Sequence, residues 1–152
     1  MIRVHVAKGH DLRLAGSPSA ALQDLGKPAT VALLPERLPF IKPRLTVATG
    51  DAVRIGSVLL EDKRRPALRF LSPGGGRVAE IRFGPRRAIR EIVVELAAEE
   101  EHETFAALDE AALAEAAPGE LAAQLMQGGL WPLIRQLPYR SIPDPDAPAP
   151  AL

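Results

Sequence analysis

The sequence contains no cysteine and few aromatic residues. The absence of thiols excludes disulfides, thiolate metal sites and iron–sulfur clusters held by cysteine. The three histidines, His5, His10 and His102, have no partner at ligand spacing, so we expect no metal site. Aromatic residues make up 4% of the 152 residues, and the hydrophobic content of 47% means that Ala, Val, Ile and Leu must supply the core.

An excess of either charge and long apolar runs are also missing. Lys plus Arg equals Asp plus Glu at 19 each, which argues against the overall basic field of a dedicated nucleic-acid-binding protein. No apolar run reaches the roughly 18 to 20 residues that span a bilayer, and no hydrophobic segment at the N-terminus resembles a signal peptide. We therefore expect a soluble chain that reaches a membrane only through a partner, and we expect no nucleic-acid partner.

Short runs that predict strands dominate the first hundred residues; several alternate apolar and polar residues, and TVALL (30–34) is a short apolar run. They occur at 2–6, 30–34, 67–71, 77–83 and 90–96. Turn signals punctuate them, namely ATGD (48–51), RIGS (54–57), SPGGG (72–76) and GPRR (84–87). Strands about ten residues apart with turns between them predict a compact barrel or sandwich. The prolines of PERLPFIKP (35–43) predict an extended, non-helical excursion.

Beyond residue 97 the sequence is rich in Ala, Glu and Leu, the strongest helix formers. Pro118 suits the first turn of a helix that ends at Gly128, and Pro132 suits the first turn of a shorter one. The tail has five prolines and offers no core, so we expect a linker, and hence a chain that is the opening part of a longer protein. The predicted fold is α+β, mainly β, with a barrel domain at 1–98, a helical segment at 99–137 and a Pro-rich linker at 138–152.

Residues 60–78, LEDKRRPALRFLSPGGGRV, invite the hypothesis of a carrier lysine. The surrounding sequence has the layout of a biotinyl or lipoyl carrier domain, whose first turn matches TGD (49–51) and whose last matches PGGGRV (73–78). Counting back from the proline of the last turn places the acceptor position at Arg65, which cannot form the carrier amide, and leaves Lys63 two positions out of register. We therefore expect a carrier-type barrel that lacks its carrier residue.

The same stretch invites two more hypotheses, a phosphate cradle and a basic patch. A phosphate loop needs glycines between a strand and a helix, whereas SPGGGRV runs between two strands, so we interpret its glycines as supplying positive φ in a tight hairpin. Nucleic-acid sites of this architecture interleave aromatic side chains for stacking, and we interpret Phe70 and Phe83 as pointing into the core.

The basic residues of this region are therefore interpreted as a solvated face or as a docking face for an acidic partner subunit. The residues that can share one side of the barrel are Lys63, Arg64, Arg65, Arg69, Arg77, Arg82, Arg86 and Arg87. Within them, the predicted docking face consists of Lys63, Arg64, Arg65 and Arg69.

Three segments resemble the corresponding parts of one known protein family. KGHDLRLAGSP (8–18) is similar to the family's opening K-G-L-D-L-P-I-A-G-x-P, and residues 47–78 are similar to V-x-x-G-D-x-V-x-x-G-x-x-L-F-E-D-K-x-x-P-G-V-x-F-x-x-P-x-x-G-x-V. GGLWPLIRQLPYRSIP (128–143) is similar to S-G-L-W-T-x-x-R-T-R-P-F-S-K-V-P, although QLPYRS shifts a basic residue to Arg140. The family is that of the A subunit of the sodium-translocating NADH:quinone oxidoreductase, and the C subunit of the Rnf complex is a more distant relative.

The resemblance implies a barrel-sandwich hybrid domain that packs on the entry to a Rossmann-like domain absent from this sequence. It implies no iron–sulfur cluster and no flavin on this chain, whereas the complex as a whole carries flavins, an iron–sulfur cluster and quinone. It also implies a peripheral position on the cytoplasmic side of the bacterial inner membrane, against other subunits of the reductase. Gly128 and Gly129 alone remain of the glycine-rich flavin loop found in a complex I relative, so we expect no flavin or nucleotide site.

Five residues are candidates for contact with a quinone headgroup or a neighbouring subunit: Phe40, Trp131, Arg135, Tyr139 and Arg140. A phenol or a guanidinium can donate a hydrogen bond to a quinone oxygen, while the indole of Trp131 is expected to pack on the barrel.

The hypothesis is a non-catalytic domain that docks on the membrane subunit near the quinone site, with the enzyme activity belonging to the whole complex. One alternative is a stand-alone, carrier-like adaptor barrel, which a modified lysine seen by mass spectrometry would favour. The other is a nucleic-acid-binding barrel, which a tight and salt-sensitive gel shift would favour.

Overall fold

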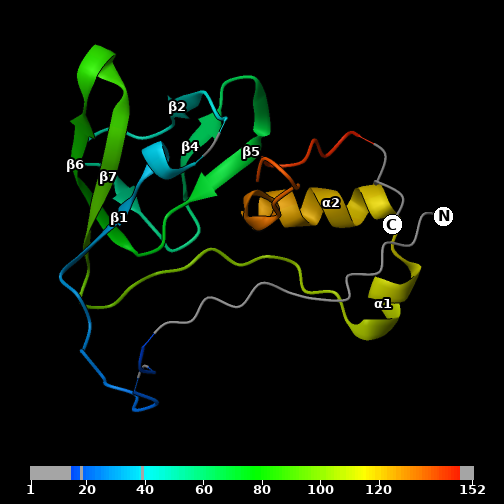
Figure 1. The fold of residues 1–152 in the computed structure, drawn as a ribbon, viewed down its shortest axis with the longest axis horizontal. Coiled ribbons are helices and arrows are strands. Elements are labelled where there is room, and N and C mark those ends of the chain that lie inside the picture. The colour runs from blue at the N-terminus through cyan, green and yellow to red at the C-terminus, as the bar shows by residue number, and fades with distance from the viewer. Residues whose placement is uncertain (1–14, 18, 39, 148–152) are drawn as a thin grey trace. The chain divides into compact units, whose positions relative to one another are not determined.

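The computed structural model describes residues 15–17, 19–38 and 40–147 (Figure 1). The chain divides into two compact units, Met1–Lys27 with Pro148–Leu152, and Pro28–Ala147. The described residues of the first unit are exposed, and a hydrogen bond from Gly26 N to Asp24 Oδ1 (2.9 Å) closes one short turn. The strand predicted at 2–6, together with His5 and His10, lies outside the described residues. The second unit holds all the strands and helices of the described part of the chain.

The second unit is built from two antiparallel sheets. The four-stranded sheet has the order β1–β7–β6–β3, and the three-stranded sheet has the order β2–β4–β5. The strands are β1 (Thr30–Leu33), β2 (Pro43–Leu45), β3 (Ala52–Val53), β4 (Val58–Asp62), β5 (Arg65–Leu71), β6 (Gly76–Phe83) and β7 (Ile89–Leu96). The strands predicted at 30–34, 67–71, 77–83 and 90–96 correspond to β1, β5, β6 and β7; those at 67–71 and 77–83 alternate apolar and polar residues, and the one at 30–34 is a short apolar run.

Alternation along the strands sends side chains from both sheets into one core. In β5, Leu68 and Phe70 are buried while Arg69 between them is exposed. In β7, Ile92 and Val94 alternate in the same way. The core consists of Val53, Leu59, Leu60, Leu68, Phe70, Val78, Ile92, Val94 and Ile142. Aliphatic side chains therefore supply nearly all of it, as the scarcity of aromatic residues predicts.

Helical structure follows the sheets. α1 (Glu110–Glu115) begins after Asp109, whose Oδ1 accepts a hydrogen bond from Ala112 N at 2.8 Å. α2 (Pro118–Gln127) begins and ends where predicted, and it lies beside β5 (Figure 1). The shorter predicted helix is the 3₁₀ turn η3 (Trp131–Leu133). No helix in the described part of the chain combines the length and the apolar character that crossing a bilayer requires.

The glycine run at 74–76 does not form a hairpin turn, so this interpretation of the sequence was wrong. β5 belongs to the three-stranded sheet and β6 to the four-stranded sheet, so the connection crosses from one sheet to the other. A Cβ at Gly74 would lie 2.2 Å from Leu96 Cδ2, and a Cβ at Gly76 would lie 1.9 Å from Glu95 O. The missing side chains thus permit close approach between neighbouring segments.

The acceptor position counted from the sequence, Arg65, does not lie in a hairpin turn. β4 and β5 form the hairpin, its turn consists of Lys63 and Arg64, and Arg65 is already paired with Asp62 in the ladder. The pairing of β4 with β5 shifts register at two places, and each irregularity changes a count made along the sequence. Lys63 therefore lies in the turn of this hairpin.

Three further expectations were wrong. η1 (Pro35–Arg37) is a 3₁₀ turn inside the segment expected to be extended, because the fixed φ of proline suits a first helical turn. Phe83 is 47% exposed, since it is the last residue of β6 and lies at the end of the hairpin. Ile142, in the tail expected to offer no core, is buried in it, and a hydrogen bond between Trp131 and Pro143 holds the tail there.

Candidate docking surfaces

The turn of the β4–β5 hairpin carries two residues of the predicted docking face, Lys63 and Arg64. Asp62 organises this turn, because its buried carboxylate accepts hydrogen bonds from Lys42 N and Arg64 N, both at 3.1 Å. Lys63 N donates to Lys42 O at 2.7 Å, and the Arg64 guanidinium donates to Phe40 O. The loop that contains Phe40 is therefore fastened to the turn, while both turn side chains stay exposed.

The other two residues of that face, Arg65 and Arg69, lie in different surroundings. Arg65 opens β5, is partly buried, and places Nη1 3.6 Å from Asp144 Oδ1. Arg69 is exposed and stands opposite Glu61 of β4, which already accepts a hydrogen bond from Arg44 Nε of β2 at 2.6 Å. Carboxylates thus offset the charge along this part of the sheet, and the four residues do not form one uniformly basic surface.

A second hairpin, β6–β7, ends in η2 (Pro85–Arg87) and carries a basic and aromatic tip. Arg86 and Arg87 have φ values of 56° and 58°, a conformation that is costly for a residue with a Cβ. The Arg87 guanidinium lies 5.9 Å from the centre of the Phe83 ring, within range of cation–π attraction. The sequence did not predict this tip, because the alternation of 77–83 suggested that Phe83 points into the core.

Arg82, in β6 of the same hairpin, is paired with two carboxylates. Its guanidinium donates to Glu91 Oε1 at 2.6 Å and to Glu80 Oε2 at 2.8 Å. The hydrogen bonds with Glu91 and Glu80 raise the pKa of Arg82 above its ordinary value, so this side chain stays protonated and paired. Glu80 and Glu91 therefore neutralise the predicted basic patch at Arg82, and the patch continues at Arg86 and Arg87 in the turn.

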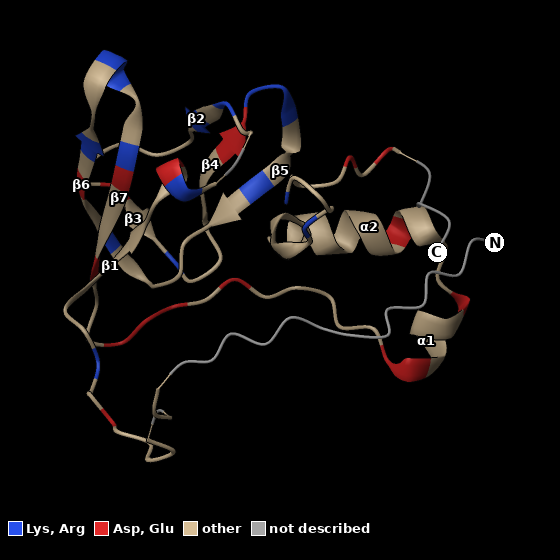
Figure 2. Cartoon of the chain, in the orientation of Figure 1, with Lys and Arg blue, Asp and Glu red and all other residues tan. Residues whose placement is uncertain are grey.

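The loop at 35–43 leads from β1 to β2 and lies next to both hairpins. Its described residues are fastened to the β4–β5 turn, and together with the β6–β7 hairpin they border a groove of about 460 Å³. The groove is lined by the apolar residues Pro35, Leu38, Ile41, Pro43 and Ile89, with Lys42 and Arg87 among its charged residues. Figure 2 shows Lys and Arg at both hairpin turns. We call this region the basic end of the barrel, and its cations are Arg37, Lys42, Lys63, Arg64, Arg86 and Arg87.

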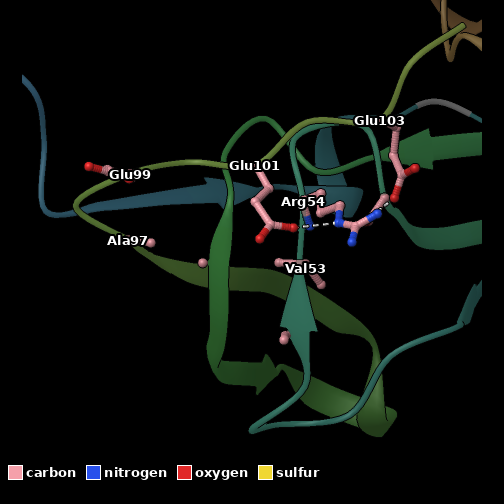
Figure 3. A pocket seen from close by; sticks show the side chains of 9 residues that line it. Val53, Arg54, Ala97, Glu99, Glu101 and Glu103 are labelled. Carbon is pink, nitrogen blue, oxygen red and sulfur yellow. Dashed lines mark hydrogen bonds and ion pairs between the residues drawn. The ribbon is translucent and has the colours of Figure 1, made fainter.

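The acidic segment after β7 contacts the barrel at another place. Figure 3 shows Glu99, Glu101 and Glu103 at a pocket of about 490 Å³ that Arg54 also lines. Arg54 Nε donates to Glu101 Oε2 at 2.7 Å. Ile55 brackets the segment, since its N donates to Glu101 O at 2.9 Å and its O accepts from Glu103 N at 2.8 Å. The pocket is thus the place where the acidic segment is attached to the barrel.

The glycine run binds a carboxylate of the same chain. Gly75 N donates to Glu100 Oε1 at 3.1 Å, and Ala97 N donates to Gly75 O at 2.9 Å. The segment considered as a phosphate cradle therefore serves an internal contact. Within the described ranges, no group of three or more His, Asp or Glu side chains is arranged to hold a metal ion.

Four of the five candidate contact residues lie between positions 131 and 140. Trp131 is partly buried against the core and its Nε1 donates to Pro143 O at 3.0 Å, in agreement with the prediction that the indole packs on the barrel. The Arg135 guanidinium donates to Pro132 O. Among the described residues, no hydrogen bond or ion pair joins Phe40 to this segment, so the fifth candidate belongs with the basic end.

The same part of the chain exposes large apolar side chains. Leu133, Leu137 and Tyr139 are 70, 79 and 77% exposed. Sequence reasoning did not single out the two leucines, because it assigned them to a helix, whereas η3 is only three residues long. We call residues 130–139 the apolar segment. Contiguous exposed apolar side chains of this kind mark interaction sites in soluble proteins.

Comparisons with known proteins match the chain to one family. The family described as the NqrA N-terminal barrel-sandwich hybrid domain matches residues 4–97, a range that includes every strand of both sheets and confirms the predicted fold class. Proteins named as the A subunit of the Na(+)-translocating NADH-quinone reductase are similar over most of the chain. The protein of Vibrio anguillarum is 36% identical over 141 residues, covering 92% of this chain and 31% of that protein. The protein of Neisseria meningitidis serogroup B is 36% identical over 144 residues, covering 95% of this chain and 32% of that protein. The chain thus spans about a third of the length of these relatives.

Proposed function

Because the chain belongs to the family of the NqrA N-terminal barrel-sandwich hybrid domain, we propose that it is a non-catalytic docking domain of a sodium-translocating NADH–quinone reductase. The relatives that it matches are named as the A subunit of that enzyme. The proposed partner is the membrane subunit that passes electrons to quinone, on the cytoplasmic side of the bacterial inner membrane. Flavins, the iron–sulfur cluster and quinone reduction then belong to the other subunits.

One observation carries the docking proposal, namely that the described part of the chain leaves the apolar segment exposed. Leu133, Leu137 and Tyr139 expose most of their surface, although Ile142 just beyond them is buried. Removing apolar surface from water on association is favourable, and a tyrosine adds a hydroxyl that can bond at the polar rim of an interface. The apolar segment therefore has the composition of a contact surface for a partner subunit.

The proposed proximity to quinone rests on polar groups in the same segment. Tyr139 and Arg140 are exposed neighbours, and Arg135 lies shortly before them in the chain. A phenol and a guanidinium both donate hydrogen bonds that suit quinone carbonyl oxygens. We infer that these groups border a quinone pocket whose apolar walls come from the membrane subunit.

Co-purification of the tagged chain with the other reductase subunits tests the docking proposal. Leu137→Glu combined with Tyr139→Glu is expected to lower recovery of the membrane subunit by about tenfold or more, because carboxylates would be desolvated at the interface. The control is Leu22→Glu with Leu25→Glu, two leucines in the other compact unit that are even more exposed. The proposal fails if the unmodified chain recovers no membrane subunit, or if both double variants behave alike.

A kinetic measurement on the assembled reductase tests the quinone part separately. Tyr139→Phe removes one hydroxyl without changing the apolar surface. We expect the KM for quinone to rise by roughly 3- to 10-fold, the value of one hydrogen bond, while co-purification is unchanged. An unaltered KM would leave docking intact and remove the proposed quinone contact.

A carrier lysine is the second candidate function, and one observation favours it. Lys63 lies in the turn of the β4–β5 hairpin, beside the buried carboxylate of Asp62. Intact-mass measurement of the chain purified from its own cells decides between the two functions. A mass increase that maps to Lys63 would support the carrier, whereas an unmodified mass would leave docking as the single candidate.

A further inference from the structure

We propose that the basic end of the barrel binds the anionic phospholipid headgroups of a membrane surface directly. This contact is separate from docking through the apolar segment, and it goes beyond the expectation that the chain reaches a membrane only through a partner. The basic end combines unpaired cations, exposed aromatic rings and an apolar groove, and each of these three features supports the proposal.

The cations of the basic end are mostly uncommitted. Within the described residues, the side chains of Lys63, Arg86 and Lys42 make no hydrogen bond or ion pair, and Arg87 contacts only the Phe83 ring. The carboxylates nearby are occupied. Glu36 faces Arg90 Nε at 3.6 Å. Asp62 is buried, accepts two main-chain hydrogen bonds and lies 3.7 Å from Arg64 Nε, so among the described residues Arg64 is the one paired cation of the basic end. The net field at this end is therefore positive and attracts anions.

The cations lie on turns, so several of them can reach one plane together. Lys63 and Arg64 occupy the turn of one hairpin, and Arg86 and Arg87 occupy the turn of the other. The loop at 35–43 ties these turns to one end of the barrel through its contact with Arg64 and through the shared groove. A bilayer presents many dispersed phosphates in one plane, which matches cations on separate turns.

Aromatic rings and the groove favour lipid over an acidic polypeptide. Phe83 is 47% and Phe40 is 66% exposed, and each adjoins an arginine of the basic end. Side chains of this type enter the boundary between headgroups and acyl chains while neighbouring cations bind phosphate. The apolar floor of the groove offers a second surface for the apolar part of a lipid.

The backbone at these positions is strained in a way that packing does not explain. Phe40, Arg86 and Arg87 have positive φ, and all three side chains are exposed. Residues held in such conformations tend to cluster at functional sites, where the strain keeps a side chain in a required direction. Three of the four described non-glycine residues with positive φ belong to the basic end, and the fourth, Arg140, lies near the apolar segment.

Vesicle co-sedimentation of the full chain tests the proposal. We expect the chain to bind vesicles of phosphatidylcholine with about a third phosphatidylglycerol at least roughly tenfold more tightly than phosphatidylcholine alone, and to lose this preference as salt rises. Arg86→Gln with Arg87→Gln is expected to weaken binding roughly tenfold or more. Arg69→Gln with Arg77→Gln removes the same net charge from exposed strand positions and is expected to change binding less than about threefold.

Two further measurements separate lipid from the alternatives. Phe83→Ser leaves the charge unchanged, and we expect it to lower binding to the anionic vesicles severalfold. Soluble polyglutamate is expected to compete poorly. Equal losses in both arginine double variants, or equal affinity for polyglutamate and for anionic vesicles, would overturn the proposal in favour of unspecific charge attraction or an acidic protein partner. Circular dichroism of each variant confirms that the comparison is between folded chains.

Discussion

Asp62 shows how a single buried carboxylate shapes a docking surface. It lies at the end of β4, where its Oδ1 accepts hydrogen bonds from Lys42 N and Arg64 N at 3.1 Å. These two donors belong to the 35–43 loop and to the hairpin turn, so one side chain joins two of the three parts of the basic end. A buried carboxylate with such bonds is favourable only while its partners remain in place.

Replacing Asp62 by Ala removes the acceptor and leaves both main-chain donors unsatisfied. We expect the free energy of unfolding to fall by roughly 1–3 kcal/mol, measured by urea unfolding followed by circular dichroism. Asp62→Asn keeps one carbonyl oxygen and is expected to cost less than Asp62→Ala. The control is Asp146→Ala, because the Asp146 carboxylate is exposed. Equal stability of Asp62→Ala and Asp146→Ala would contradict this role.

At the scale of elements, the connection from β5 to β6 crosses from one sheet to the other in a tightly packed space. It passes from β5 to β6 through three glycines whose neighbours leave no room for side chains. Main-chain atoms line part of this space, and Glu95 O among them belongs to β7, which is paired on both sides and cannot shift without breaking ladder hydrogen bonds. Positions 74–76 therefore require glycine, because a Cβ there would overlap neighbouring atoms.

Gly76→Ala tests this constraint. The added Cβ would lie 1.9 Å from Glu95 O, so we expect a loss of roughly 3 kcal/mol or more in the free energy of unfolding. The matched change is Gly119→Ala in the first turn of α2, where a Cβ meets nothing within 4 Å. That substitution is expected to stabilise by about 0.5 kcal/mol, since alanine favours the helix. Similar effects at both positions would refute the explanation based on space.

The strands could be predicted from the sequence, but their pairing could not. Alternation identified β5, β6 and β7 because each has one buried face, and that signal is local. Which sheet a strand joins depends on partners far along the chain, so SPGGG looked like a hairpin turn while it is a crossing between sheets. The misplaced hairpin tip has a similar origin, since register shifts in β4 and β5 are invisible in a residue count.

The candidate surfaces were predictable only in part, for a related reason. The cations of the two hairpin turns, Lys63, Arg64, Arg86 and Arg87, could be named from the sequence, yet the loop at 35–43 was predicted only to be extended. The hydrogen bond from Arg64 to Phe40 O and the groove next to Ile89 arise from long-range packing. Leu133 and Leu137 were not singled out, because the sequence placed them in a helical segment and gave no sign of their exposure.

At the scale of the whole molecule, residues 28–147 form one compact unit. The division at residues 98 and 137 remains a proposal. The tail nevertheless contributes Ile142 to the core formed by the two sheets. Part of the Pro-rich segment is thus needed to complete the barrel, and its dissociation would expose the apolar surface under Ile142 to water.

Ile142→Ala measures how much the tail contributes. We expect a loss of about 2–4 kcal/mol in the free energy of unfolding, the usual cost of truncating a buried isoleucine. Leu137→Ala, at an exposed position of the same segment, is expected to change stability by less than about 0.5 kcal/mol. If both substitutions have the same small effect, the tail does not stabilise the barrel.

The position of Trp131 gives the molecule a built-in optical reporter. It is the one tryptophan of the sequence, and its indole packs partly buried against the core while Nε1 is bonded to Pro143 O. Intrinsic fluorescence excited at the indole band therefore reports from a single place, the junction of tail and barrel. Detachment of the tail would move the emission to longer wavelength. A partner that covers the neighbouring apolar segment would move it to shorter wavelength, so docking can be followed in solution without a label.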